Sequence, residues 1–131
     1  MELKDLALLS NASLCGDSLE VFEFSIDTRS IKKGQVYIAI EGQNFDGHDF
    51  IEDAEIKGAS ALIVSREISS SLPFIIVHNT LDFMETIAVH NRSSFNGNVI
   101  GITGTNGKTT SKQILSSLLS QIHKTHKTDG N

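Results

Sequence analysis

The sequence predicts an α/β protein, with one domain over residues 1–96 and a separate segment over residues 97–131. Short apolar runs alternate along the chain with amphipathic segments, as they do when strands and helices follow one another. The chain has 131 residues, of which 39% are hydrophobic and 21% charged, so one domain with a real core is expected. A turn-like stretch, FNGN, covers residues 95–98 and puts the boundary near Gly97.

The first domain is expected to begin with a helix and two strands. Residues 3–12 carry apolar side chains at helical spacing, which predicts a short amphipathic helix. Alternating apolar and polar residues predict a half-buried strand over 21–26, and a continuous apolar run predicts a second strand over 36–40. A loop with two glycines follows, and then a helix for which Asp49 is the expected N-cap and Gly58 the end.

Two more strands and a long helix complete the first domain. The strands are expected at the short apolar runs 61–64 and 73–77, which a polar connection separates. The next segment is strongly amphipathic, with Thr80 as its expected N-cap. Beyond the boundary, a strand over 99–103 is expected to lead through a glycine-rich turn into a helix, which is the usual setting of a phosphate site.

Charge and composition exclude several classes of protein. Residues 1–96 hold seven Lys and Arg against fifteen Asp and Glu, and this acidic body argues against a nucleic-acid partner. No apolar run reaches the roughly 18 residues of a membrane helix, and the N-terminus lacks the basic start of a signal peptide. Cys15 is the only cysteine, so no disulfide can form within the chain. We therefore expect a cytoplasmic protein without a membrane partner.

The turn after the expected strand 99–103 has the composition of a phosphate-binding loop. Backbone N–H groups gather at the positive end of a helix, and glycine lets the backbone approach a phosphate closely. In such a loop Lys108 would reach the β- and γ-phosphates and the Thr109 hydroxyl would bind Mg²⁺. The strict pattern G-x-x-x-x-G-K-[ST] is not met, because Ile102 stands six residues before Lys108. What stands here is the shorter TGTNGKTT, residues 103–110.

This short loop resembles the ATP loop of the Mur ligase family, the ATP-dependent amide-bond ligases of peptidoglycan synthesis. Residues 27–64 also resemble the N-terminal UDP-binding domain of the later ligases of that family. The resemblance implies a small N-terminal α/β UDP-binding domain, followed by the first β-strand, P-loop and helix of a truncated P-loop ATPase domain. It implies ATP and Mg²⁺ as cofactors, with Lys108 and Thr109 as catalytic residues and Thr109 as the Mg²⁺ ligand. The implied ATP site comprises Gly104, Thr105, Asn106, Gly107, Lys108, Thr109 and Thr110.

Two short motifs of the first domain match the UDP-contacting segments of the family. An arginine beside a hydroxyl can hold a diphosphate through charge-assisted hydrogen bonds. Without the resemblance, the first motif is equally well explained by a capped turn with a surface arginine. Taken alone, the second is better explained by a turn in which Asp46 bonds its own backbone, but with Arg29 before it across a strand a nucleotide-binding edge is the better interpretation. The implied UDP contacts are Asp27, Thr28, Arg29, Gly42, Asn44, Phe45, Asp46, Gly47 and His48.

The resemblance also implies a reaction, in which ATP phosphorylates a terminal carboxylate and an amine then attacks the acyl phosphate to form an amide. The segment THKTDGN, residues 125–131, is similar to the MurF-type members. These join D-alanyl-D-alanine to UDP-N-acetylmuramoyl-tripeptide, which are therefore the expected partners. The alternative is a MurE-type ligase, which adds the third-position amino acid.

Much of the family's catalytic machinery has no counterpart in these 131 residues. We therefore expect an inactive fragment that keeps the UDP-binding domain. The full-length protein is expected to be a monomer, whereas the apolar face of the last helix favours self-association of the fragment. Two other classes stay open: a UDP-sugar-binding module without chemistry, and a small unrelated P-loop protein that binds ATP by itself.

Overall fold

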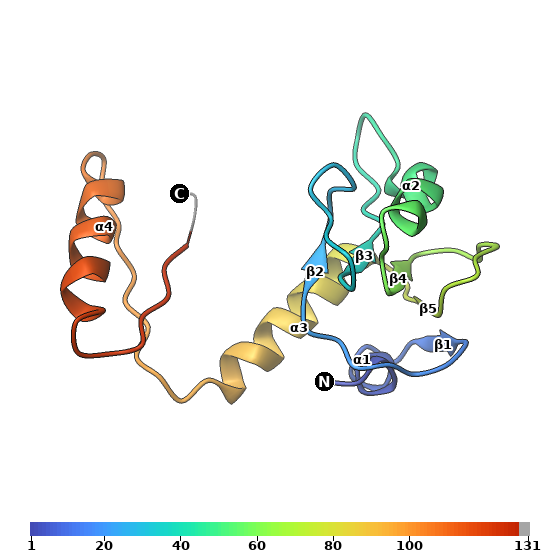
Figure 1. Cartoon of the computed structure of the whole chain (residues 1–131), viewed down its shortest axis with the longest axis horizontal. Coiled ribbons are helices and arrows are strands. Elements are labelled where there is room, and N and C mark those ends of the chain that lie inside the picture. Colours follow the sequence, from blue (N-terminus) through green and yellow to red (C-terminus); the bar gives the residue numbers. More distant parts are fainter. Residues whose placement is uncertain (129–131) are drawn as a thin grey trace. The chain divides into compact units, whose positions relative to one another are not determined.

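The computed structural model describes residues 1–128. The chain divides into two compact units, Met1–Phe95 and Asn96–Asn131 (Figure 1). The first unit contains a sheet with helices, and the described part of the second unit contains one helix. No helix within residues 1–128 has both the length and the apolar character needed to cross a membrane.

The first unit is built on a five-stranded sheet with the strand order β1-β5-β4-β3-β2. Strands β2 to β5 run parallel, and β1 pairs antiparallel with β5 at one side of the sheet. Because parallel neighbours need a crossover, the segments that leave β2 to β5 all start at the same edge. The strands are β1 (Ser13–Cys15), β2 (Phe24–Ser25), β3 (Val36–Ile38), β4 (Ala61–Val64) and β5 (Phe74–Ile76).

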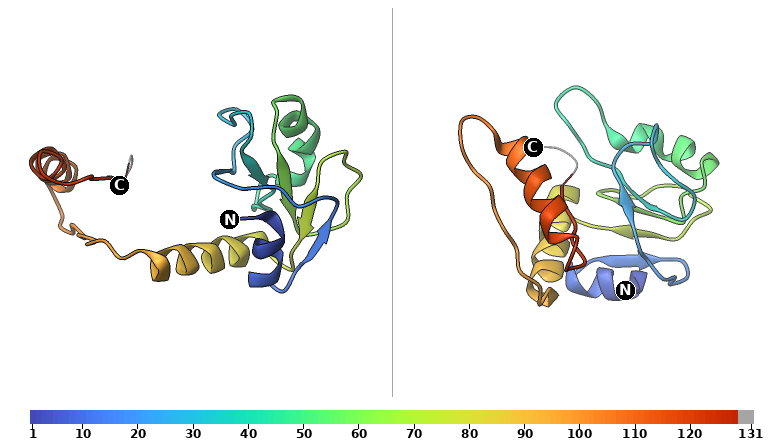
Figure 2. Two further views of the ribbon diagram at one scale, coloured as in Figure 1. Left: turned by 60° about the horizontal axis from the view of Figure 1, so that its bottom comes forward. Right: turned by 60° about the vertical axis from the view of Figure 1, so that its left-hand side comes forward.

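Helices cover both faces of this sheet, as the two views of Figure 2 show. On one face, Leu6 of α1 and Phe83 of α3 share a buried cluster with Ile63 of the sheet. On the other face, Ile51 and Ala54 of α2 pack with other strand residues. Burial of each large apolar side chain contributes about 1.5–3 kcal/mol. The helices are α1 (Leu3–Leu9), the 3₁₀ helix η1 (Gly47–Phe50), α2 (Ile51–Ile56) and α3 (Thr80–Ser94).

The central strands are apolar throughout because they feed both cores. Successive strand residues point to opposite faces of a sheet. In β4, Ala61 and Ile63 belong to the cluster with α1 and α3, while Leu62 and Val64 belong to the cluster with α2. All four are fully buried, which explains why the sequence shows a continuous apolar run here rather than alternation.

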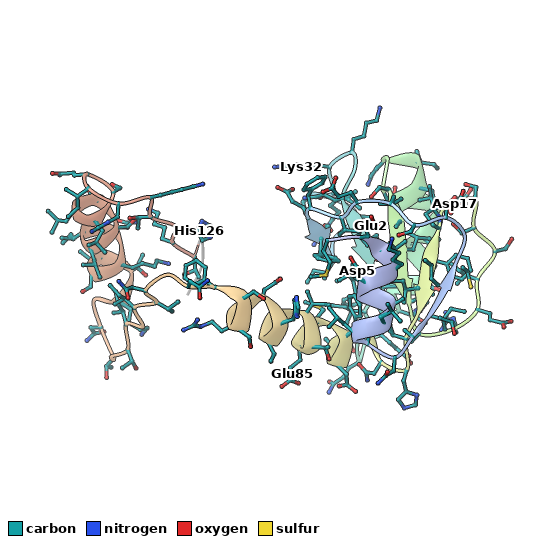
Figure 3. All side chains as sticks on the ribbon, turned by 90° about the horizontal axis from the view of Figure 1, so that it is seen from below. Glu2, Asp5, Asp17, Lys32, Glu85 and His126 are labelled. Atoms are coloured by element: carbon teal, nitrogen blue, oxygen red, sulfur yellow. The ribbon has the colours of Figure 1, made fainter. Side chains whose placement is uncertain are left out.

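Helix α1 begins with a capping box formed by Glu2 and Asp5. The Asp5 carboxylate accepts a hydrogen bond from the backbone N–H of Glu2 at 3.1 Å. Both side chains are labelled in Figure 3, at the start of the helix. Lys4 adds an ion pair to Glu2 at 2.8 Å. The capping box itself provides partners for backbone N–H groups at the start of the helix that lack partners within it.

Two helix starts differ from those predicted. The N-cap of α3 is Asn79 rather than Thr80, because the Asn79 side chain accepts hydrogen bonds from two backbone N–H groups of the first turn. The cap expected at Asp49 is also wrong: the N-cap of α2 is Phe50, without a side-chain cap bond, and the side-chain cap in this region is Asp46, which caps η1 by accepting from the backbone N–H of His48 at 2.9 Å. Each capping side chain accepts from a backbone N–H two or three residues later in the chain. The residue that caps the helix therefore lies earlier in the sequence than the predicted one.

The strands also depart from the prediction in extent and number. Strand β2 keeps two of the six residues expected over 21–26, and β3 ends before the predicted limit at residue 40. Strand β1 was not predicted, because three residues are too few to show a period. It forms through pairing with β5, where Ser13 lies opposite Ile76.

In the second unit, helix α4 (Lys108–Leu119) follows the glycine loop, as expected. The strand predicted over 99–103 is wrong, because these residues form no strand. A strand requires a hydrogen-bonded neighbour, and no segment within residues 1–128 pairs with this one. Helix α4 has no buried residue, and Ile114 and Leu118 are more than half exposed.

Gly47 is required by a close approach of two backbones. Its N–H donates to the carbonyl of Ile40 at 2.8 Å, which draws the start of η1 against the end of β3. A Cβ at this position would lie 2.6 Å from the Ile40 nitrogen and 2.8 Å from its carbonyl oxygen. Neither atom is the end of a flexible side chain that could swing away, so only glycine fits without a backbone shift.

We predict that Gly47→Ala destabilises the first unit by about 1–3 kcal/mol, because the added methyl group overlaps the backbone of Ile40, just after β3. Urea unfolding followed by circular dichroism measures this change. Gly101→Ala is the matched control, since an added Cβ there meets no atom within 4 Å and should leave stability unchanged. Equal midpoints for the two variants would contradict the steric argument.

Candidate functional site

Four segments meet where the parallel strands end, and we call this place the carboxyl edge. All nine residues expected to contact UDP lie in the first two of these segments. Ligand crevices of open parallel sheets lie outside the carboxyl ends of the strands, so this is where a site is expected. The segments are residues 26–29 after β2, 39–48 after β3, 65–66 after β4 and 77–80 after β5.

The turn of Asp27 and Arg29 is held by its own ion pair. The Arg29 backbone N–H donates to Oδ1 of Asp27 at 2.9 Å, and Nε and Nη2 of Arg29 bind its two carboxylate oxygens. These hydrogen bonds lower the pKa of Asp27 to about 2. Thr28 points inward and is buried, and hydrogen bonds from Lys57 and Thr28 lower the pKa of Asp53. The capped-turn interpretation is therefore correct for Asp27 and Thr28, while the Arg29 side chain stays 87% exposed.

The loop after β3 is a tight hairpin with an exposed tip. The N–H of Gly42 donates to the carbonyl of Phe45 at 2.9 Å, and Glu41 and Asp46 form an antiparallel bridge at the base. Asn44 and Phe45 are exposed, and Phe45 as a whole residue is 63% exposed. The tip is thus open to a ligand, while the base is fixed.

His48 joins the base of this loop to the end of β4. The backbone N–H of Ser65 donates to Nε2 of His48 at 3.0 Å, so Nε2 carries no proton. The ring proton therefore lies on Nδ1, which donates to Oδ1 of Asp46 at 2.6 Å. The His48 side chain is only 2% exposed, so its role at the carboxyl edge is to hold Asp46.

Asp46 receives hydrogen bonds on both carboxylate oxygens. Oδ1 accepts from the backbone and the ring of His48, and Oδ2 accepts from Nη1 of Arg66 at 2.7 Å. Burial acts to raise the pKa of Asp46, but these hydrogen bonds outweigh it and lower the pKa to about 2. The carboxylate therefore stabilises the fold above its ordinary pKa of 3.8, and that contribution is lost as the pH falls towards 2.

Tyr37 connects the two motifs. Its buried hydroxyl donates to the carbonyl oxygen of Gly47 at 3.0 Å. Burial first, and then the charges of Asp27, Asp46 and Asp53, raise the pKa of Tyr37 to about 12. Because β2 and β3 are parallel neighbours with Ser25 opposite Tyr37, the Asp27 turn and the loop of Asp46 leave the sheet at the same edge.

The sequence prediction missed three residues of this edge: Tyr37, Ser65 and Arg66. Ser65 and Arg66 directly follow the apolar run 61–64, so the rule about carboxyl ends of parallel strands could have identified them. Tyr37 is the only aromatic residue in the strand predicted over 36–40, and its hydroxyl needed a partner there. No sequence signal pairs Asp46 with Arg66, because that contact depends on the fold.

Two hollows lie near these residues. The smaller, of about 70 Å³, is well below the 300–1,000 Å³ typical of ligand pockets. The larger, of about 520 Å³, is an open depression beside α2, and three acidic residues of its lining make it unfavourable for phosphates. The smaller is lined by Glu41, Ser65, His78, Asn79, Thr80 and Leu81. The acidic residues of the larger are Asp49, Glu52 and Glu55.

The glycine loop of the second unit ends at Gly107, the N-cap of α4, whose φ of 79° favours glycine. Gly104 also has a positive φ, of 149°. The Nζ of Lys108 donates to the carbonyl oxygen of Gly104 at 2.7 Å, so this side chain folds back over the loop. The other residues of the implied ATP site, namely Thr105, Asn106, Thr109 and Thr110, are exposed.

The loop residues fit a nucleotide phosphate. The first N–H groups of a helix lack partners within the helix and carry the positive end of its dipole, and Lys108 stands beside them. For Mg²⁺, residues 1–128 contain no group of three or more His, Cys, Asp or Glu side chains that could hold a metal. The Thr109 hydroxyl would therefore be one ligand among phosphate oxygens and water.

Comparison with known proteins identifies the family. A model described as the Mur ligase family, catalytic domain, matches residues 21–93, which is more than half of the chain. The chain belongs to the Mur ligase family. The matched residues include the Asp27 turn, the loop of Asp46 and His48, and Arg66, whereas the glycine loop lies outside them.

Two kinds of Mur ligase are similar to this chain. The UDP-N-acetylmuramoyl-tripeptide–D-alanyl-D-alanine ligase of Escherichia coli (strain K12) is 35% identical over 98% of the chain and 28% of its own length. The UDP-N-acetylmuramoyl-L-alanyl-D-glutamate–2,6-diaminopimelate ligase of Aquifex aeolicus is 43% identical over 72% of the chain and 20% of its own length. The chain thus spans between a fifth and a third of the length of these relatives.

Solved Mur ligases share the fold. The MurF ligase of Thermotoga maritima in complex with ADP matches 83% of this chain and 26% of its own, with a TM-score of 0.68 and 38% identity. The mixed α/β fold predicted from the sequence is therefore confirmed.

We predict that Tyr37 titrates near pH 12 in the folded protein and near pH 10 when unfolded. The folded state holds the proton more tightly, so stability is full below pH 10 and falls as the pH rises towards 12, by up to about 3 kcal/mol. Phenolate absorbance measures this, because Tyr37 is the only tyrosine and the chain has no tryptophan. A midpoint near pH 10 while circular dichroism still shows the folded state would contradict the buried placement.

Proposed function

We propose that this chain binds the UDP end of UDP-N-acetylmuramoyl-tripeptide at the carboxyl edge. The observation that carries the proposal is that the Asp27 turn and the Asp46 loop leave neighbouring parallel strands at the same edge, where the Tyr37 hydroxyl bonds the carbonyl oxygen of Gly47. In the intact enzyme, we propose, this binding serves an ATP-dependent ligase of peptidoglycan synthesis that joins the tripeptide to D-alanyl-D-alanine. Similarity to the Escherichia coli ligase over 98% of the chain supports this assignment.

The residues of the proposed UDP site divide by burial into two groups. Thr28, Gly47 and His48 are buried and hold the backbone in place. Arg29 and the exposed tip of the loop, with Asn44 and Phe45, are available to a ligand. We propose that Phe45 stacks on the base, because an exposed aromatic ring offers a flat apolar surface.

ATP would be held by the glycine loop of the second unit, from Gly104 to Thr110. Its phosphates would lie against the N-terminus of α4, and Lys108 would exchange its bond to the Gly104 carbonyl for phosphate oxygens. Bound ATP supplies the phosphoryl group that activates the carboxylate of the substrate. The contribution of these residues is to position the phosphates and neutralise their charge.

A MurE-type ligase that adds the third-position amino acid is the second candidate. It is favoured by the 43% identity to the Aquifex aeolicus ligase. That similarity covers 97 residues, whereas similarity to the Escherichia coli D-alanyl-D-alanine ligase covers 129. Because the longer match takes in nearly the whole chain, we prefer the MurF-type reaction.

We expect UDP-N-acetylmuramoyl-tripeptide to shift the amide resonances of the Asp27 turn and the loop of Asn44 and Phe45 in an NMR titration. Those of α4 should stay in place. Phe45→Ala should weaken binding about tenfold through loss of stacking, and exposed Phe22→Ala is the matched control. An unshifted carboxyl edge at saturating ligand would overturn the proposal.

We further expect the 131-residue chain by itself to release no phosphate from ATP in the presence of both substrates and Mg²⁺. The physical reason is that the Thr109 hydroxyl would be a single metal ligand, and residues 1–128 hold no cluster of His, Cys, Asp or Glu that would help to orient the reacting groups. A coupled phosphate assay measures this against a full-length MurF-type relative. Release at a comparable rate would contradict the expectation.

A further inference from the structure

We propose that Arg66 is the residue that grips the diphosphate at the carboxyl edge, with Arg29 contributing mainly charge. The inference rests on the proposed UDP-binding function and assigns its diphosphate subsite. Arg66 lies two residues after the end of β4, the central strand of the sheet, so it stands between the loop after β3 and the segment after β5. Its side chain is 52% exposed and therefore accessible.

The two arginines differ in which part of the guanidinium is occupied. Arg29 uses Nε and Nη2, the pair of donors that best matches two oxygens side by side, to bind Asp27. Within residues 1–128, Arg66 makes one side-chain hydrogen bond, from Nη1 to Asp46. Its Nε and Nη2 pair is therefore open to a ligand, whereas that of Arg29 is already filled.

Arg66 is also held in position before a ligand arrives. Its partner Asp46 is fixed by the ring and the backbone of His48, and His48 is fixed by the backbone N–H of Ser65. The long Arg66 side chain is thus already ordered in the folded protein, so less conformational entropy is lost when a ligand binds.

Charge favours a diphosphate as the occupant. Residues 1–96 have a large excess of acidic side chains, so an anion needs a local cation to bind there. The chain has three arginines, Arg29, Arg66 and Arg92, of which the first two lie at the carboxyl edge. Arg92 lies in the last turn of α3 instead. A guanidinium with an open pair of donors suits the neighbouring oxygens of a phosphate better than it suits a neutral base.

Binding of UDP, uridine and inorganic pyrophosphate to the full 131-residue chain, measured by calorimetry, tests this. We expect Arg66→Gln to weaken UDP and pyrophosphate about tenfold and to leave uridine unchanged. Arg66→Lys keeps the charge and a donor for Asp46 but loses the paired donors, so it should restore only part of the affinity. Arg29→Gln should weaken UDP by a smaller factor. Arg92→Gln, the matched control, should bind as the unaltered chain does.

The outcomes distinguish failure of the diphosphate role of Arg66 from failure of the proposed UDP-binding function. Unchanged UDP affinity in Arg66→Gln, full affinity in Arg66→Lys, or a parallel loss of uridine binding would each overturn the diphosphate role of Arg66. If the unaltered chain binds pyrophosphate through Arg66 but UDP no more tightly, the diphosphate grip stands and the UDP function fails. If it binds none of the three, both are overturned.

Discussion

The hydrogen bond from the backbone N–H of Ser65 to Nε2 of His48 is the constraint on which the carboxyl edge depends. A backbone N–H can only donate, so it forces the proton of the imidazole onto Nδ1. The ring then has one donor, and that donor faces Asp46. A chain of bonds thus runs from the end of β4 through a buried ring to the loop after β3, and its direction is fixed by one peptide group.

This arrangement separates residues that hold the site from residues that can touch a ligand. In the Asp27 motif, Thr28 turns into the fold and Arg29 turns out. In the loop after β3, Gly47 and His48 are buried while Phe45 is exposed. Within each motif, some residues therefore shape the backbone while others face the solvent. Arg66, which bonds Asp46, lies outside both motifs.

Much of the fold could be predicted from the sequence, because its strands coincide with short apolar runs. The run 61–64 matches β4 residue for residue, since a strand buried on both faces has no polar positions to blur its ends. Strand β1 could not be predicted, because it exists only through pairing with β5. The reverse error occurred at 99–103, where strand-like residues have no partner within residues 1–128.

The sequence indicated that the two motifs would lie near one another, but not which residues they would contact. Asp27 to Arg29 and the loop of Asp46 were expected at a binding edge, and they lie together at the carboxyl edge. The pairing of Asp46 with Arg66 joins residues twenty positions apart, which only the parallel packing of β3 and β4 brings together. Local pattern carries no information on such a contact.

The capping of its helix N-termini explains why the first unit would need an arginine side chain to hold a phosphate. Helix N-termini are the usual anion sites of α/β folds, and two of them begin at the carboxyl edge. At η1 the side chain of Asp46 takes the available N–H and brings a negative charge. At α3 the Asn79 side chain takes two N–H groups of the first turn. With both helix starts satisfied from within, the donors left for an anion belong to side chains. The second unit differs, because the N-cap of α4 is Gly107, which has no side chain to cap the helix.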